Sequence, residues 1–145
     1  MNNNEFVYTT YIRTTPEEVW RAITNPEFTR QYWGAHENVS DWKKGSKWQH
    51  IFSKDKLVRV GGQVLESVPP KRLVLTWAAP NYLSDDSRVT YEIDTAGDMV
   101  RLTVIHDNFK TDSIMATKVI NGWPLVLSSM KSFLETGQGL EIRKK

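Results

Sequence analysis

Apolar and polar residues alternate along the first two thirds of this 145-residue chain, and the spacing then changes. Segment 5–13 is rich in Phe, Tyr, Val, Thr and Ile, which is typical of a strand. Short alternating runs recur up to His106, separated by turn residues such as those at 44–46 and 95–98. Connections this short cannot hold crossover helices, so the pattern predicts an antiparallel meander. The expected strands after the first are 39–43, 46–52, 57–67, 72–77, 88–94 and 100–106.

Two short helices are expected directly after the first strand. Thr15 is a good N-cap residue, Pro16 suits the first helical position, and Glu18 stands three residues beyond the cap, which is the capping-box pattern. This helix should end before Pro26, because the residue before a proline disfavours helical backbone. A second short helix is predicted from Pro26 to about Tyr32.

The last part of the chain has the period of a long amphipathic helix, about 3.6 residues. Its start is expected between 116 and 121, and Gly137 should end it. Pro124 either stands in the first turn of this helix or interrupts a helix that began upstream, and the sequence leaves both readings open. The apolar positions at helical spacing are Trp123, Leu127, Met130 and Leu134.

The order of these elements predicts an α+β fold of the helix-grip type in one domain that spans residues 1–145. A sheet of six to seven antiparallel strands curls, and one helix with a broad apolar face is left to cover its concave side. Segment 80–87 is polar and should form a surface loop between two strands.

Composition narrows the function classes. There is no cysteine, which excludes disulfides, thiolate metal sites and a cysteine nucleophile. The formal net charge is only +2 and the basic residues are scattered, so we expect no nucleic-acid partner. Apolar runs are far shorter than the roughly 18 residues of a membrane span, which predicts no membrane insertion. The amino terminus lacks the pattern of an export signal, so a cytoplasmic location is expected.

A resemblance to a known family rests on several short stretches in order along the chain. Residues 15–26, Thr-Pro-Glu-Glu-Val-Trp-Arg-Ala-Ile-Thr-Asn-Pro, resemble the first-helix signature of the family of homologues of the heat-shock-protein-90 ATPase activator (Aha-type), within the START and Bet v 1-like (SRPBCC) superfamily. Further stretches that resemble the family are 41–46, 62–66, 69–77, 101–106 and 122–137. The resemblance implies a helix-grip fold that holds a small hydrophobic ligand between the sheet and the last helix.

Aromatic residues supply the candidate cavity wall. The chain has six Trp, five Tyr and five Phe, and such side chains either line a small-molecule pocket or fill an ordinary core. Both readings stay open at this stage. The cavity candidates are Trp33, Trp48, Phe52, Trp77, Tyr91, His106, Trp123, Leu127 and Met130.

The chemistry-bearing residues do not form a catalytic or metal-binding motif. His36 is expected in a loop, His50 and His106 on strands, and their spacing fits no metal site, so we expect no metal, no cofactor and no catalytic residue. Glu66 and Glu92 should face solvent or a basic neighbour.

The first functional hypothesis is therefore non-enzymatic binding of a small hydrophobic or aromatic molecule by a monomer or homodimer. One alternative is a chaperone-associated module. That activity belongs by name to larger proteins with a further amino-terminal domain, so it is not carried over directly. The other alternative is a cavity enzyme of the cyclase, dehydratase or hydrolase type, with His106 or Glu66 as acid or base.

Overall fold

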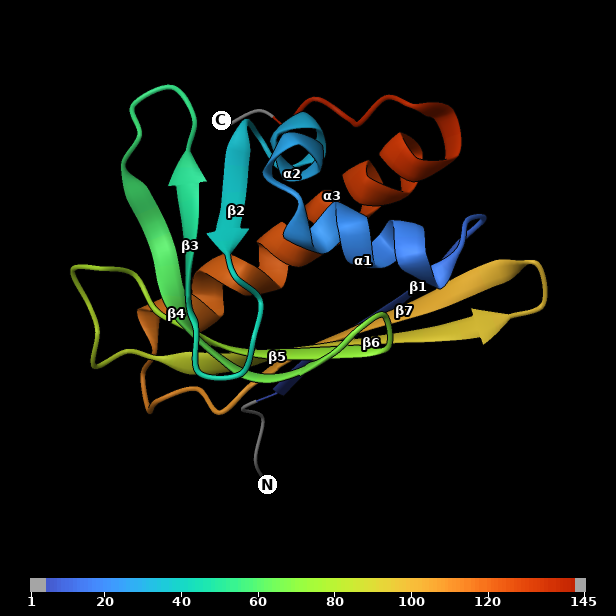
Figure 1. Ribbon diagram of the computed structural model, residues 1–145. Helices are drawn as coiled ribbons and strands as arrows, with labels where there is room; N and C mark the ends of the chain where they lie inside the picture. Colours follow the sequence, from blue (N-terminus) through green and yellow to red (C-terminus); the bar gives the residue numbers. More distant parts are fainter. Residues whose placement is uncertain (1–4, 143–145) are drawn as a thin grey trace.

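The computed structural model describes residues 5–142, which form a curved sheet with helices on one side (Figure 1). None of the helices in this part of the chain has the length and apolar character needed to cross a membrane. In chain order the elements are β1 (Glu5–Ile12), α1 (Pro16–Thr24), α2 (Pro26–Tyr32), β2 (His36–Ser40), β3 (Lys47–Phe52), β4 (Val58–Val68), β5 (Arg72–Trp77), β6 (Ser87–Ala96), β7 (Met99–Asp107) and α3 (Ile114–Thr136).

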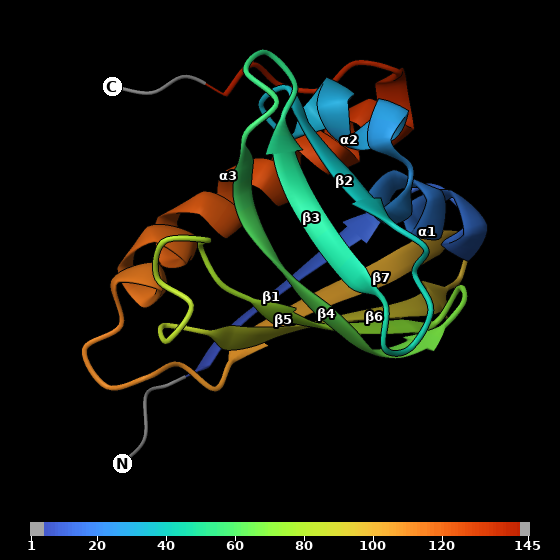
Figure 2. The same ribbon diagram turned by 60° about the vertical axis from the view of Figure 1, so that its left-hand side comes forward.

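All seven strands join one antiparallel sheet in the order β1-β7-β6-β5-β4-β3-β2. Strands β2, β3 and β4 turn upward from the plane of β5, β6 and β7, and α3 crosses the concave side that this turn creates (Figures 1 and 2). The predicted α+β helix-grip fold, with a long last helix on the concave face, is confirmed.

Strand β4 carries the bend, and its glycines allow it. A Cβ atom at Gly62 would overlap the carbonyl and hydroxyl oxygens of Thr76, so only glycine lets the two strands approach this closely. The register between β4 and β5 also shifts between Val64 and Glu66. The Thr76 carbonyl oxygen accepts a hydrogen bond of 2.7 Å from Trp48 Nε1, which holds the Trp48 ring at the junction of the flat and upturned parts.

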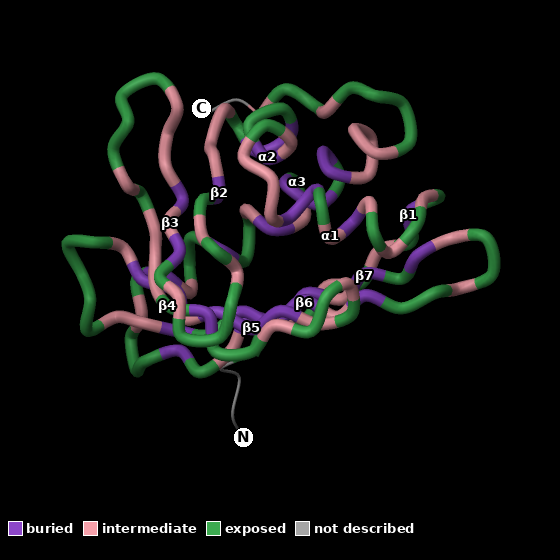
Figure 3. The backbone as a smooth tube through the Cα atoms, viewed as in Figure 1, coloured by how far each residue is buried: buried purple, intermediate pink, exposed green. Residues whose placement is uncertain are grey.

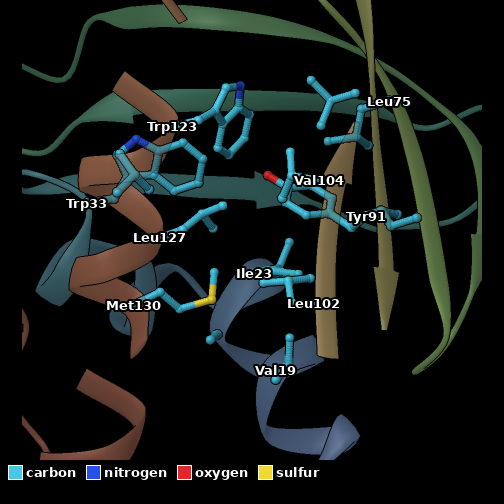
Figure 4. Packing of buried hydrophobic residues seen from close by; sticks show 14 of the residues in the cluster. Val19, Ile23, Trp33, Leu75, Tyr91, Leu102, Val104, Trp123, Leu127 and Met130 are labelled. Carbon is cyan, nitrogen blue, oxygen red and sulfur yellow. The ribbon is translucent and has the colours of Figure 1, made fainter. Parts of the chain in front are cut away.

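The core lies between the concave face of the sheet and the three helices, and Figure 3 shows its buried backbone positions on β5, β6 and β7 and along α3. Alternate residues of each strand point into it, as the period of two requires. Leu127 and Met130 of α3 are fully buried, and in Figure 4 Met130 points toward the end of the core where Val19 and Ile23 of α1 lie.

The first helix begins as the capping pattern predicts. Thr15 is the N-cap residue and its hydroxyl oxygen accepts a hydrogen bond of 3.2 Å from the Glu18 backbone N–H. Pro16 occupies the first turn. The next helix follows at once, because Asn25 ends α1 and its side-chain oxygen caps α2 through the Glu27 N–H at 2.9 Å.

The expected strand 39–43 is wrong in its bounds, because β2 runs from His36 to Ser40. Trp42 has a left-handed φ of 57°, so the chain turns there and cannot continue the strand. The pairing of His36 with Phe52 and of Ser40 with Trp48 sets the register of β2 instead. His36, expected in a loop, is therefore a strand residue.

Helix α3 begins upstream of the expected start, at Ile114. The Ser113 hydroxyl oxygen accepts a hydrogen bond of 3.1 Å from the Ala116 N–H, and Asp85 Oδ2 accepts one of 3.0 Å from the Met115 N–H. Asp85 belongs to the loop before β6, so a contact distant in sequence extends the helix. Pro124 consequently lies inside the helix, which decides between the two readings left open by the sequence. Gly137 ends α3 in the left-handed conformation, as predicted.

Candidate functional site

An apolar hollow of about 240 Å³ lies between the first half of α3 and the strands β4 and β5. It occupies one end of the concave side of the sheet, where the sheet bends away from the helix. Its wall is largely aromatic and aliphatic. The lining residues are Trp33, Arg59, Val60, Trp77, Ala79, Met115, Lys118, Val119, Gly122, Trp123 and Val126.

Three tryptophans from three different elements form the inner wall of this hollow. Trp33 follows α2 directly, Trp77 is the last residue of β5, and Trp123 stands in the middle of α3. The ring centroids of Trp33 and Trp123 are 5.6 Å apart, those of Trp77 and Trp123 5.5 Å, and those of Trp33 and Trp77 6.4 Å. All three side chains are at least nine-tenths buried, so their rings are held by packing.

Gly122 keeps the helix side of the hollow open. It lies one residue before Trp123 on α3, and a Cβ atom built on it would meet no atom within 4 Å. Met115 and Val119 come from the two preceding turns and add flexible and branched apolar groups to the same wall. Helix α3 therefore leaves open space beside Gly122.

Two cationic side chains, Arg59 and Lys118, belong to the lining and are exposed, so they mark the solvent side of the hollow. Arg59 is already engaged, since its Nη2 lies 2.5 Å from Asp55 Oδ2 and its guanidinium lies 5.4 Å from the centre of the Phe52 ring. Lys118 has no ion-pair partner among residues 5–142.

His106 is buried next to Trp77 and Trp123, and a chain of hydrogen bonds runs through it from Trp123 to Trp77. Trp123 Nε1 donates to His106 Nδ1 at 3.0 Å, so His106 carries its proton on Nε2 and donates to Ser87 Oγ at 2.7 Å. The Ser87 hydroxyl in turn donates to the Trp77 carbonyl oxygen at 3.2 Å. Burial lowers the pKa of His106 to about 3, although the nearby Asp107 acts in the opposite direction.

His50 supports the wall from the other side. Its Nδ1 donates to Asn38 Oδ1 at 2.6 Å, and its ring centroid lies 4.8 Å from that of Trp33. The ring of His36 stacks parallel on it at 4.4 Å. Burial, followed by the charge of His36, lowers the pKa of His50 to about 3. The uncharged rings of His50 and His106 therefore pack against the three tryptophans.

Comparison with known families identifies the chain's relatives. The profile of the family described as "Activator of Hsp90 ATPase homolog 1-like protein" matches residues 13–135, most of the chain. This chain belongs to that family. The resemblance inferred from the sequence motifs is therefore confirmed. A comparison with curated proteins finds no match.

Solved structures share the fold of this Aha1-like chain. The Aha1 dimer from Colwellia psychrerythraea is 18% identical with a TM-score of 0.76, covering 93% of this chain and 98% of its own. PFC0360w, an HSP90 activator from Plasmodium falciparum, is 22% identical with a TM-score of 0.70, covering 83% and 88%. CalU16 from Micromonospora echinospora is 22% identical with a TM-score of 0.73, covering 94% and 76%.

The predicted cavity residues of this Aha1-like chain divide into three groups. Trp33, Trp77 and Trp123 line the hollow. Phe52 lies outside it, at the end of β3, where its ring contacts His36 at 5.0 Å and Arg59. The remaining candidates are buried and lie outside this hollow: Trp48 lines a separate hollow of about 400 Å³ along β3 and β4, and Tyr91, His106, Leu127 and Met130 pack inside the core.

Several residues that line the hollow were not among the predicted cavity residues. Val60, Ala79 and Lys118 give no signal in the sequence, because their position depends on how β4 and the loop after β5 meet α3. Gly122 does give one, since a glycine inside an apolar helical pattern costs helix stability and marks a position where the backbone face is left open.

Larger hollows of this Aha1-like chain are lined by several charged side chains. One of about 620 Å³ lies on the convex face of the sheet, where Arg72 bonds Glu66 at 2.8 Å and Glu92 at 2.6 Å. The prediction that these two glutamates face solvent or a basic neighbour is confirmed. Another, of about 560 Å³, lies between α2, the end of β3 and residues 140–142. Within residues 5–142, His, Asp and Glu side chains form no group of three that could hold a metal ion.

Proposed function

We propose that this chain binds a small hydrophobic or aromatic molecule in the hollow between α3 and the bent sheet, without catalysing a reaction. The observation that carries the proposal is an open, apolar volume walled by Trp33, Trp77 and Trp123 beside a helix position that has no side chain. Such a concave apolar site with a few polar groups at its edge is the usual form of a small-molecule site.

The energetics favour an apolar occupant. The hollow is lined by indole rings and by the side chains of Met115 and Val119, which would offer a water molecule few hydrogen bonds. Each Å² of this apolar wall removed from water contributes roughly 25 cal/mol. Met115 has an unbranched and polarisable side chain that can adjust to occupants of different shape.

The enzymatic alternative finds no support in the geometry of the titratable groups. Both ring nitrogens of His106 are engaged, one as acceptor from Trp123 and one as donor to Ser87. Ser87 is therefore not activated by a base, because the shared proton belongs to His106. Glu66 pairs with Arg72 on the opposite face of the sheet.

The test starts with native mass spectrometry of the purified protein, followed by denaturing extraction and identification of any small molecule that travels with it. Binding of that molecule, or of naphthalene-sized aromatic probes, is then measured by calorimetry on two variants. Gly122→Leu places a side chain in the open space and should weaken binding at least tenfold without unfolding the protein. Gly122→Ala is the matched control and should keep most of the affinity.

The outcomes distinguish a wrong location of the binding site from a wrong assignment of ligand binding. Loss of binding in Gly122→Leu alone supports this hollow as the site. Unchanged binding in Gly122→Leu would place the ligand elsewhere, and a protein that carries no molecule and binds no probe would remove the proposal.

A second candidate function is activation of a heat-shock-protein-90 ATPase, which the family match favours. Its test is the ATPase rate of purified heat-shock protein 90 with and without this chain. If both functions exist and are independent, Gly122→Leu should abolish ligand binding and leave the ATPase effect unchanged. An unchanged ATPase rate with the wild-type chain in molar excess would exclude this candidate for that chaperone.

A further inference from the structure

The two edges of the sheet, β1 and β2, differ in how they are covered. The backbone N–H of Asn38 on β2 donates to Thr29 Oγ1 of α2 at 3.0 Å, and Asn38 is buried, so α2 lies along that edge. Among residues 5–142, β1 pairs with β7 alone. It contains no proline or lysine, and its register with β7 has no shift. Such residues and bulges commonly keep an edge strand from pairing with another chain, so β1 is open to such pairing.

The odd-numbered residues of β1 point their backbone groups out of the sheet. The Ile93 N–H bonds the Lys71 carbonyl oxygen at 2.9 Å, so the odd-numbered residues of β6 bond toward β5 and the even-numbered ones toward β7. In antiparallel strands the N–H and C=O of one residue point to the same side, and the side alternates along the strand. Carried through the registers of β6 with β7 and of β7 with β1, this alternation leaves Val7 and Thr9 facing outward.

Helix α3 covers only the far end of this edge. Lys131 Nζ donates to the Tyr11 carbonyl oxygen at 2.6 Å, and the Arg13 N–H donates to Glu135 Oε2 at 2.8 Å. In the part of the chain that the structure describes, no side chain bonds the outward backbone groups of residues 5–9. This segment is therefore the open part of the edge.

Pairing the open segment with itself about Val7 brings matching side chains together. Val7, which is 51% exposed, would face Val7 of the second copy. The rings of Phe6 and Tyr8 stack at 6.4 Å, and each would face the other residue type across the contact, where aromatic pairs stabilise neighbouring strands. The Glu5 carboxylate, which forms no ion pair among the described residues, would accept a hydrogen bond from the Thr9 hydroxyl of the second copy.

We propose that a second copy of this chain binds along β1, antiparallel and about a two-fold axis at Val7, so that the two seven-stranded sheets join into one. A two-fold contact uses the same surface on both copies and closes at the dimer. The inference does not rest on ligand binding, because β6 and β7 separate β1 from the strands that line the hollow.

Cysteine cross-linking tests the axis directly, because the chain has no cysteine of its own. Val7→Cys places a thiol opposite its own copy with the Cα atoms about 5.5 Å apart, a separation that a disulfide spans. Mild oxidation should convert most of this variant into a covalent dimer. Tyr11→Cys is the matched control, since Tyr11 is 45% exposed on the same strand but lies away from the axis. It should cross-link at least about tenfold more slowly, because no pairing brings its thiols together.

Charge substitutions at the same residue test whether the contact is self-complementary. Val7→Lys sets two lysines against each other and should raise the dissociation constant of the dimer at least about tenfold in analytical ultracentrifugation. Leu65→Lys adds the same charge at an exposed residue of β4 and should leave the constant unchanged. An equimolar mixture of Val7→Lys and Val7→Glu should dimerise again, because opposite charges then face each other. Both side chains are exposed, so these variants keep the core intact.

The results decide the inference in either direction. A wild-type chain that stays monomeric at its highest soluble concentration, or a dimer that Val7→Lys leaves intact, would show that no second copy covers β1. Equal cross-linking of Val7→Cys and Tyr11→Cys would contradict an axis at Val7. Gly122→Leu should dimerise like the wild type, so a failure of the proposed ligand binding is distinguishable from a failure of this contact.

Discussion

At the scale of single residues, hydrogen-bond partners decide the protonation of the buried histidines. Trp123 Nε1 can only donate, so it makes Nδ1 of His106 an acceptor and leaves the ring neutral. Asn38 turns its carbonyl oxygen to His50 while its amide nitrogen donates to the Ile23 carbonyl oxygen at 3.2 Å. Both rings thus stay uncharged in the folded state. Adding a proton to either would bury a charge, and at His106 it would also break the bond from Trp123.

We therefore expect the free energy of unfolding to fall as the pH is lowered below 6.5. The folded-state pKa of both His50 and His106 is lowered to about 3, so between the two values the unfolded chain binds the extra protons. Each histidine contributes a slope that approaches about 1.4 kcal/mol per pH unit, and this stability is fully present only above pH 6.5. Urea unfolding between pH 5 and 7.5 measures the slope.

The control for this prediction is a direct titration by NMR. The ring signals of His50 and His106 should not move between pH 7.5 and 5, with the proton of His106 on Nε2. A ring that titrates near pH 6 in the folded protein, or a flat stability profile, would contradict the prediction.

At the scale of elements, α3 contains two glycines with opposite roles. Gly122 has ordinary helical backbone in the interior of the helix and nothing within 4 Å of its missing Cβ. Gly137 has a φ of 88° at the end, and its N–H bonds the Phe133 carbonyl oxygen at 2.8 Å. The same residue type therefore costs stability at the first position and supplies it at the second.

Alanine at each glycine should change stability in opposite directions. Gly122→Ala should raise the free energy of unfolding by about 0.5–1 kcal/mol, because alanine loses less backbone freedom on entering a helix. Gly137→Ala should lower it by about 1 kcal/mol or more, because an L side chain disfavours the left-handed conformation. Thermal and urea unfolding of the pair measure the difference; equal effects would mean that one of the two backbone conformations is different in solution.

At the scale of the whole molecule, the candidate site lies where the sheet bends at β4. Strand β4 crosses from the flat part to the upturned part, with Gly62 against Thr76 and Trp48 bonded to the same carbonyl group. This bend separates β4 from the first half of α3 and leaves the hollow between them. The hollow therefore adjoins this close strand contact, since Arg59 and Val60 of its lining precede Gly62 on β4.

Gly62→Ala should disrupt that contact and lower the free energy of unfolding by about 2 kcal/mol or more, because backbone atoms of Thr76 cannot give way as a flexible side chain would. Aromatic probe binding should weaken as well, since the wall moves with the strand. Gly122→Ala serves as the matched control with the same added methyl group. A Gly62→Ala protein of wild-type stability and affinity would show that the bend does not depend on this glycine.

Much of the fold could be predicted from local pattern. Thr15, Pro16 and Glu18 mark the start of α1 through bonds that close within four residues, and the alternation of β5 to β7 follows from the geometry of one strand. The bounds that could not be predicted depend on distant partners. Strand β2 ends where its pairing with β3 ends, and α3 starts early because Asp85 binds the Met115 N–H.

For the site, local pattern gave the residue types and their spacing, and it made a set of aromatic side chains candidates for the concave side. Which of them pack in the core and which line a hollow depends on the tertiary structure. Trp33, Trp77 and Trp123 are far apart along the chain, and their meeting depends on strand register, the bend at Gly62 and the position of α3. The spacing of apolar residues depends on neighbours in the sequence. A hollow depends instead on how closely segments that are distant in the sequence pack together.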